Sequence, residues 1–194
     1  MSLIFSKALK SGIFEVHDDR PECEFIHVFQ VHGKDIVPAG EALNEADGIT
    51  SQLSQLDRPL AIKTADCIPA VLEGSTDVVF LHAGWRGVAL KIFEQKEIER
   101  IAPQCAYIGP CIHSCCYEVS SDFKLNFPES KNFTERDGKL YFNLPEEASD
   151  QIKRKYPHIK VEIDSQCTMC NSKFHSFRRN ATKQRNWNLY RKGT

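Results

Sequence analysis

The residues best suited to chemistry cluster between Thr64 and Gly87, in the segment TADCIPAVLEGSTDVVFLHAGWRG. Cys67 lies just before the apolar run IPAVLE, and His82 lies just after the apolar run DVVFL. A cysteine sulfur and a histidine nitrogen are both zinc ligands, and together they also form nucleophile–base pairs in cysteine enzymes. The segment therefore predicts either a metal site or a thiolate–imidazole pair.

A hairpin would bring these two residues together. Gly74-Ser75 predicts a two-residue type II′ turn, in which Glu73 pairs with Thr76 and Cys67 lies opposite His82. Directly opposed residues share one face of the ladder, with Cβ atoms about 4.5–5.5 Å apart. A slip of one residue would send the two side chains to opposite faces. Pro69 favours an edge or a bulge at that position, because it cannot donate to a ladder.

A third candidate ligand is His32, in the segment FQVHGKD at the predicted end of a strand. Two histidines and one cysteine make a three-ligand set that leaves a fourth zinc position for water or substrate, as in catalytic zinc sites. A single histidine on a strand is more often a surface or core residue, so spacing alone leaves both interpretations open.

The chain has 194 residues, 41% of them hydrophobic, with a formal charge of −1. This size suits one domain over residues 1–194, and the charge argues against a nucleic-acid or anionic-membrane surface. The start of the chain lacks the pattern of a secretory signal, and no apolar run is long enough to span a membrane. The eight cysteines are therefore expected to be reduced thiols of a cytoplasmic protein rather than a disulfide framework.

The elements that must position these residues are a mixture of strands and helices. Asp137-Gly138 predicts a further hairpin turn between FTER and KLYFNL. Without a regular βαβ alternation, the pattern favours an α+β fold or a mixed-sheet α/β sandwich. The expected strands cover residues 24–31, 60–63, 69–73, 78–81, 106–108 and 161–163, and the expected helices cover residues 87–100, 120–127 and 145–155.

Several motifs carry a resemblance to a known family. They are QVHG (residues 30–33), ADGITS (46–51), TADC (64–67), HAGWRG (82–87), IGPCI (108–112), YEV (117–119) and the tail CTMCNSKFHSFRRN (167–180). In this order they resemble the YfiH/laccase-domain family, also called the multicopper polyphenol oxidoreductase or purine nucleoside phosphorylase-like family. The resemblance covers roughly residues 25–180, and TADC followed by HAGWRG is its most specific part.

The resemblance implies the layered sandwich fold shared with the deamidating domain of cytotoxic necrotizing factor. It maps the family's metal ligands onto His32, Cys67 and His82. Family members are described as zinc-dependent enzymes that phosphorolyse adenosine, inosine, guanosine and methylthioadenosine to base and sugar 1-phosphate, and that deaminate adenosine. Older descriptions call them copper laccases, and bacterial members have been linked to editing of peptidoglycan precursors. The implied partners are thus purine nucleosides and phosphate.

The neighbouring residues suggest roles in such a reaction. Phosphorolysis needs a phosphate site beside the ribose, for which the candidates are Arg86, Arg178 and Arg179, with Gln30 as a further substrate-binding residue. Asp66 is expected either to orient a ligand histidine or to act as a general base, although it could equally cap a turn. For deamination, a zinc ion would lower the pKa of its bound water.

Trp85 and the other cysteines carry weaker predictions. Trp85 could stack on a purine base or simply pack against the core. The pair Cys167-x-x-Cys170 has zinc-knuckle spacing, and Cys111, Cys115 and Cys116 could complete a second site, although buried or incidental thiols are the commoner outcome.

The chain also departs from the family. Its members usually carry an arginine- and glycine-rich segment before QVHG that has no clear equivalent here, and SFRRN has Asn180 where an acidic residue is common. Two other classes of function remain open: a metal-free cysteine hydrolase or amidase that uses Cys67 and His82, and an accessory protein of the cell-wall or division machinery that binds metal without turnover. The copper laccase is the weakest alternative, because a multicopper site needs many more histidines than one triad and the chain has seven.

Overall fold

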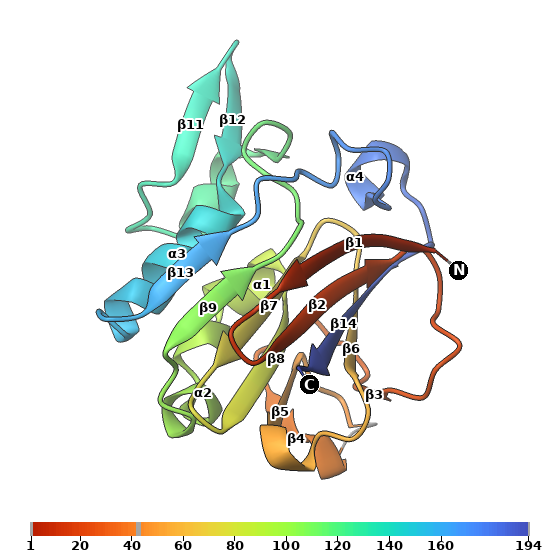
Figure 1. The fold of residues 1–194 in the computed structure, drawn as a ribbon. Helices are drawn as coiled ribbons and strands as arrows, with labels where there is room; N and C mark the ends of the chain where they lie inside the picture. Colours follow the sequence, from red (N-terminus) through yellow and green to blue (C-terminus); the bar gives the residue numbers. More distant parts are fainter. Residues whose placement is uncertain (1, 42–43, 194) are drawn as a thin grey trace.

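The computed structural model describes residues 2–41 and 44–193, and its centre is a six-stranded mixed sheet (Figure 1). The order of its strands is β13-β9-β7-β8-β5-β4. Their bounds are β4 Ile36–Pro38, β5 Gly48–Gln52, β7 Ile68–Glu73, β8 Asp77–Ala83, β9 Cys105–Ile108 and β13 Lys160–Ile163. The β7–β8 hairpin is the middle of this sheet, and it is antiparallel, whereas β9 and β13 pair in parallel.

A five-stranded sheet covers one face of the first sheet, in the order β1-β2-β14-β6-β3. Its strands are β1 Leu3–Ala8, β2 Gly12–His17, β3 Ile26–His27, β6 Leu60–Thr64 and β14 Asn186–Lys192. Strand β14 pairs with β2 on one side and β6 on the other, so the two ends of the described chain meet in one sheet. A small third sheet joins β10 Glu118–Val119, β12 Lys139–Phe142 and β11 Phe133–Arg136, whose hairpin stands away from the main body (Figure 1).

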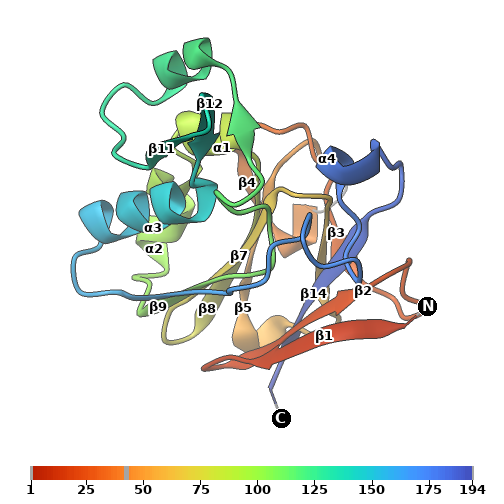
Figure 2. The ribbon, with the colours of Figure 1, turned by 90° about the horizontal axis from the view of Figure 1, so that it is seen from above.

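Helices cover the other face of the six-stranded sheet, which gives the order helices, sheet, sheet (Figure 2). The long helix is α3 Leu144–Lys155, with acidic residues in its first turn and basic residues in its last, as the helix dipole favours. The remaining helical segments are α1 Trp85–Ala89, α2 Lys96–Arg100, α4 Phe177–Asn180 and the short 3₁₀ turns η1 Ala39–Glu41, η2 Leu53–Gln55, η3 Ile92–Glu94 and η4 Ser121–Asn126. None of the helices in the described part of the chain is long and apolar enough to cross a membrane.

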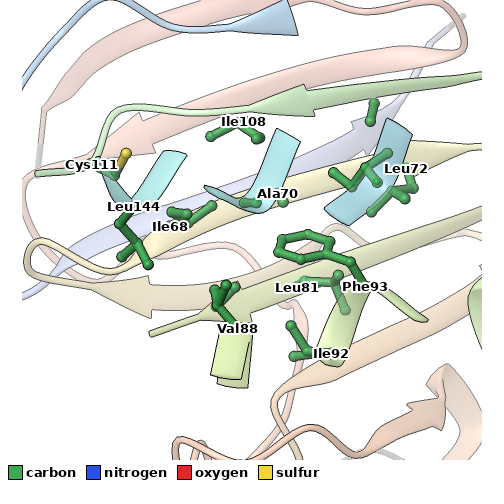
Figure 3. Close-up of a cluster of buried hydrophobic side chains, with 14 of the residues drawn as sticks. Ile68, Ala70, Leu72, Leu81, Val88, Ile92, Phe93, Ile108, Cys111 and Leu144 are labelled. Carbon is green, nitrogen blue, oxygen red and sulfur yellow. The ribbon is translucent and has the colours of Figure 1, made fainter. Parts of the chain in front are cut away.

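Both faces of the β7–β8 hairpin are buried, which explains its almost unbroken apolar sequence. Ala70 and Leu81 pack against Val88 and Phe93 of the helical layer (Figure 3). The alternate residues of the same strands, such as Phe80, pack toward the five-stranded sheet in a second core. The hairpin is thereby fixed between two hydrophobic layers, and so are the residues at its ends.

The α+β mixed-sheet fold expected from the sequence is confirmed, and so are the strands near residues 60–63, 69–73, 78–81, 106–108 and 161–163 and the helix over 145–155. The hairpin at Asp137-Gly138 is also confirmed, and both residues have positive φ, at 50° and 71°.

Three expectations about local structure were wrong. The helix over 87–100 is broken into α1, η3 and α2 at Lys91, whose φ is 64°, because Ile92 and Phe93 turn into the core there. The strand over 24–31 is reduced to β3 and an isolated bridge at Phe29, and the helix over 120–127 is the 3₁₀ turn η4.

The turn between β7 and β8 also differs from the expectation. Glu73 pairs with Val78 rather than with Thr76, because the connection is longer than two residues and the backbone N–H of Gly74 donates to the carbonyl of Asp77. The partner of His82 is consequently Pro69 and not Cys67.

Candidate active site

Three side chains from separate connections meet at one end of the β7–β8 hairpin. His32 lies on the turn between β3 and β4, Cys67 lies directly before β7, and His82 is near the end of β8. One ligand atom of each lies within 4.8 Å of the others. The imidazole rings of His32 and His82 meet edge to face, with centroids 4.8 Å apart. The structure therefore brings together the three residues that the sequence proposed as metal ligands.

Cys67 and His82 still approach each other because the observed β7–β8 register differs from the expected one by two residues. Since side chains along a strand alternate with a period of two, a shift of two keeps every residue on its face. Position 67 is now diagonal to His82 rather than opposite to it, at the point where β7 begins. The prediction that Cys67 and His82 approach each other was thus right although the pairing behind it was wrong.

Asp47 organises two of the three residues. Its Oδ1 atom accepts a hydrogen bond from Nδ1 of His82 at 2.7 Å, and both side chains are buried. The same carboxylate accepts backbone N–H bonds from His32 at 3.0 Å and Gly33 at 2.5 Å. These bonds hold the turn in which His32 has a φ of 60°, a conformation that is uncommon outside glycine. A single carboxylate therefore orients the ring of His82 and the turn that carries His32.

The charges at this site depend strongly on one another. Burial would raise the pKa of Asp47, but the hydrogen bonds from His82 and Gly33 hold it below its ordinary value. Burial would also raise the pKa of Cys67, yet hydrogen bonds from His32 and His82 lower it to about 6. The pKa of His82 is raised to about 9, because the carboxylate of Asp47 and the thiolate of Cys67 outweigh the opposing effect of burial. In the absence of a metal the group is thus a thiolate–imidazolium–carboxylate arrangement.

The donor set also fits a metal ion. Nδ1 of His82 is bonded to Asp47. The other ring nitrogen, Nε2, is therefore the one available to a metal ion shared with Cys67 and His32. A ligand histidine that donates its other ring nitrogen to a carboxylate is the usual arrangement at zinc sites. His32 is exposed and Cys67 is partly exposed, so the open side of the triad faces solvent. Three protein ligands with one open side match a catalytic zinc site better than a closed structural one.

The triad opens into a cavity of about 620 Å³, a volume within the range of small-molecule sites. Two aromatic side chains at the cavity, Phe29 and Phe177, are 55% and 54% exposed, although large apolar side chains are usually covered. The cavity is also lined by four basic side chains, which are Lys63, Arg86, Arg178 and Arg185. Exposed aromatic surface beside several positive charges suits a ligand with a flat ring and an anionic group.

The structure places Gln30 and Asp66 at the cavity, but with their polar atoms already engaged. The amide of Gln30 accepts from the backbone N–H of Lys63 at 2.8 Å and donates to its carbonyl at 2.7 Å. Asp66 accepts from the hydroxyl of Thr168 and from the backbone N–H of Arg178, both at 2.7 Å. The carboxylate bonded to the ligand histidine is therefore Asp47, and Asp66 instead holds the tail segment against the site.

The arginines proposed for phosphate differ in their surroundings. Arg86 is exposed at the cavity, with its guanidinium 4.5 Å from the centre of the Trp85 ring. Arg178 lines the cavity, donates to the carbonyl of Glu118 and stacks on Tyr117. Arg179 is not among the cavity-lining residues and donates to backbone carbonyls of the tail, including that of Thr168 at 2.9 Å.

Trp85 packs edge to face on Phe123, with ring centroids 5.2 Å apart, and is partly buried against the helical core. Its ring also lines the cavity and carries the guanidinium of Arg86.

The sequence interpretation missed Asp47, the two exposed phenylalanines and two of the basic residues at the cavity. Asp47 lies inside the ADGITS motif, so its position in a motif was the available signal. Phe177 lies in the tail motif and Phe29 directly precedes QVHG, but nothing in the sequence marks either ring as exposed. Lys63 and Arg185 lie outside the motifs, and only the fold brings them to the same cavity.

Comparisons with known proteins agree with this architecture. A family model described as multi-copper polyphenol oxidoreductase laccase matches residues 14–189. Aquifex aeolicus purine nucleoside phosphorylase is 34% identical over 149 residues, which are 73% of this chain and 68% of that protein. Escherichia coli purine nucleoside phosphorylase YfiH is 27% identical over 172 residues, which are 80% of this chain and 69% of that protein.

Solved structures show the same relationship. A Neisseria meningitidis protein of the DUF152 family superimposes with a TM-score of 0.77 at 28% identity, over 88% of this chain and 75% of that one. YlmD from Geobacillus stearothermophilus superimposes with a TM-score of 0.72 at 28% identity, over 86% and 72%. The matches to the curated relatives span 42% to 69% of those proteins' own lengths. Fold, motifs and sequence identity together establish that this chain belongs to the YfiH/laccase-domain family.

Proposed function

We propose that this chain is a zinc-dependent purine nucleoside enzyme that phosphorolyses adenosine, inosine, guanosine and methylthioadenosine to base and sugar 1-phosphate, and that deaminates adenosine. The observation that carries this proposal is the position of the triad: His32, Cys67 and His82 meet at a cavity that also bears exposed aromatic rings and free positive charge. The Aquifex aeolicus and Escherichia coli relatives are both named purine nucleoside phosphorylase, which supports the same substrate class.

The proposed roles begin with the metal. His32, Cys67 and His82 would hold the ion, and Asp47 would keep the ring of His82 in the tautomer that presents Nε2. When bound, a zinc ion supplies Lewis-acid stabilisation of developing negative charge and lowers the pKa of bound water. The remaining tasks of binding and positioning fall to residues of the chain.

In phosphorolysis a phosphate oxygen forms a bond to C1′ of the ribose while the bond from C1′ to the base nitrogen breaks, and its electron pair leaves with the base. Arg86 is exposed at the cavity, and because its guanidinium stacks on the face of Trp85, its N–H groups at the edge can donate to a phosphate. Arg178 also lines the cavity and can contribute a second positive charge. Phe29 and Phe177 offer faces on which a purine can stack.

The same family carries a copper-laccase description, and a His₂Cys donor set also suits copper. A multicopper enzyme needs several histidine-rich centres, however. Of the seven histidines, the candidate metal groups among the described residues contain only His32 and His82. Zinc at a single catalytic position is therefore the metal that we propose.

A second candidate function rests on the same triad without a metal. The pKa of Cys67 is lowered to about 6, and His82 bonded to Asp47 has the connectivity of a base and its orienting acid. These features favour a cysteine hydrolase or amidase if no metal occupies the site. Such an enzyme should be inactivated by alkylation of Cys67 and be indifferent to a chelator.

The test is phosphate-dependent release of free base from adenosine and inosine, followed by chromatography on zinc-replete protein. Cys67→Ala is the inactive control, and Cys23→Ala, an exposed cysteine outside the cavity, is the matched variant. Release that requires phosphate, disappears in Cys67→Ala and persists in Cys23→Ala supports the proposal. Inosine formed from adenosine without phosphate would establish the deamination.

Absence of release from protein that holds zinc at the triad would refute the nucleoside proposal. Amide and cell-wall substrates would then be tested, with peptidoglycan precursors first. Activity that persists after chelation would favour the cysteine hydrolase. We place the enzyme in the cytoplasm as one catalytic domain over residues 1–194, a location supported by eight free cysteines and an extent supported by the family match over 14–189.

A further inference from the structure

Four cysteines from two connections meet outside the triad. Cys115 and Cys116 lie in the turn that follows β9, and Cys167 and Cys170 lie in the turn that follows β13. The two connections run side by side, since β9 and β13 are parallel and an isolated bridge joins Cys111 to Cys167 (Figure 1). All four sulfur atoms lie within 4.8 Å of one another. We refer to these four residues as the thiol cluster.

The sulfur distances suit a shared ion better than a disulfide. The sulfur of Cys170 lies 3.6 Å from that of Cys115 and 3.2 Å from that of Cys116. A disulfide requires about 2.04 Å. Four sulfurs placed tetrahedrally at about 2.3 Å from a zinc ion lie about 3.8 Å apart. Only small rotations of these side chains separate the thiol cluster from that arrangement.

The backbone around Cys167 is arranged to hold a thiolate. Its sulfur accepts a bond from the backbone N–H of His113 at 3.5 Å, and the N–H groups of Met169 and Cys170 point at it as well. A Cys-x-x-Cys turn whose first sulfur is surrounded by N–H donors is pre-organised for a cation, because metal ligands must be thiolates.

Positive charge is also placed beside both turns. The guanidinium of Arg136 donates to the carbonyl of Ser114 at 2.7 Å and to that of Cys115 at 3.2 Å. The guanidinium of Arg179 donates to the carbonyls of Thr168 and Met169 at 2.9 and 3.1 Å. Four thiolates around a divalent ion carry a net charge of −2. The arginine bonded to each turn partly offsets that charge.

We propose that Cys115, Cys116, Cys167 and Cys170 bind a second zinc ion, in a closed four-sulfur structural site distinct from the triad. This assignment does not depend on the reaction at the triad. It gives Arg179 a role that its position away from the cavity otherwise leaves unexplained.

The second ion would fasten one wall of the cavity. The connection after β9 supplies Ile112 and Tyr117 to that wall, and the tail after Cys170 supplies Phe177 and Arg178. Thr168, between the two cysteines of the tail, donates to Asp66 beside the triad. Joining the connections through metal would reduce the freedom of the tail and hold Arg178 and Phe177 in place.

The experiment measures zinc per chain by elemental analysis of full-length protein purified in zinc and then freed of loosely bound metal. The expected result is that Cys167→Ser/Cys170→Ser loses one equivalent of zinc relative to the parent chain. The control Cys23→Ser/Cys105→Ser, which removes two cysteines outside the cluster, keeps the parent content. A triad variant, His32→Ala, loses one equivalent independently, so the two losses add in the combined variant.

Cobalt provides a second measurement that does not depend on retention of zinc. Loading His32→Ala/Cys67→Ala protein with Co²⁺ should produce the thiolate-to-cobalt charge-transfer absorption and the visible bands of a tetrahedral four-sulfur site. Adding Cys116→Ser should shift and weaken these bands without unfolding the chain, as circular dichroism would check. Equal zinc in the parent and in Cys167→Ser/Cys170→Ser, absence of cobalt–thiolate absorption, or mass-spectrometric recovery of the cluster as a disulfide would each overturn the proposal.

Discussion

Oδ1 of Asp47 lies 2.7 Å from Nδ1 of His82, and the same carboxylate bonds the backbone of the turn that carries His32. Neither contact involves the proposed metal position, yet together they orient two of the three proposed ligands, His32 and His82. The relationship makes Asp47 a positioning residue, and it leads to the first prediction.

Replacing Asp47 by Asn should weaken zinc binding at the triad by about 10–100-fold, as loss of an orienting carboxylate typically does. The amide retains an acceptor for the turn but cannot supply the negative charge that now faces His82. Competition with a chromophoric chelator would measure the affinity. Asp35→Asn, at an exposed position on the connection that carries His32, is the matched control and should leave the affinity unchanged. Equal affinity in the two variants would contradict the positioning role.

Gly84→Ala should disturb the triad by sterics alone. Its φ of −72° suits any residue, but an added Cβ would lie 3.2 Å from the sulfur of Cys67 and 3.4 Å from Cδ2 of His32. A displacement of a few tenths of an ångström in both ligands should lower zinc affinity by roughly tenfold and leave the melting temperature nearly unchanged. Gly40→Ala, where the added methyl meets nothing within 4 Å, provides the comparison. Wild-type affinity in Gly84→Ala would mean that the glycine has no role at the site.

In the metal-free protein, the rates at which Cys67 and Cys105 are alkylated should follow the pKa values of their thiols. The pKa of Cys67 is lowered to about 6 and that of Cys105 is raised to about 11, the latter by burial and the carboxylate of Glu73. Because the thiolate is the nucleophile, alkylation of Cys67 should rise through about pH 6 and then level off. Alkylation of Cys105 should still be slow and rising at about pH 9. Peptide mapping after iodoacetamide treatment at several pH values would measure both, and added zinc should protect Cys67 alone. A Cys67 rate that follows the ordinary pKa of a thiol would count against the described hydrogen bonds.

The exposed phenylalanines should affect nucleoside binding. Phe177→Ala is expected to raise the KM for adenosine by about tenfold and to leave the KM for phosphate unchanged, because base stacking contributes about 1–3 kcal/mol. Phe29→Ala should act in the same direction. Leu125→Ala removes an even more exposed apolar side chain away from the cavity and should have no effect. An unchanged KM for adenosine in both phenylalanine variants would show that the purine does not stack on these rings.

Arg86 should affect phosphate instead. Arg86→Ala is expected to raise the KM for phosphate by tenfold or more, the loss of one charge-assisted pair, with a smaller change in the KM for nucleoside. Arg86→Lys should recover part of the effect, since charge returns without the planar fork. Arg100→Ala, on exposed α2, serves as the control. Full phosphorolysis with an unchanged KM for phosphate in Arg86→Ala would show that Arg86 does not bind phosphate.

The sequence predicted the centre of the fold well because burial there leaves a clear pattern. Strands β7 and β8 are apolar on both faces, and α3 has charges matched to its dipole. Strand β14 could not be predicted in this way, since its first three residues include Asn186 and Asn188. Both are buried, with their amides bonded to His175 and Thr64, so polar residues occupy what a hydrophobic pattern treats as exposed positions.

The same limit applies to the site. Motifs identified His32, Cys67 and His82 because unusual residue types occur there at a distinctive spacing. Phe29 and Phe177 are ordinary residues that become notable only when their exposure is known. The break at Lys91 follows from packing of Ile92 and Phe93, which overrides the helix propensity of the segment.

The position of β14 has a consequence for how the molecule is assembled during synthesis. This strand completes the five-stranded sheet between β2 and β6, although it follows β2 by about 170 residues. Until residues 186–192 have left the ribosome, β2 and β6 present facing unpaired edges, and the core between the two sheets lacks the side chain of Tyr190. The nascent chain therefore carries two open sheet edges through most of its translation, the kind of surface on which chaperones act.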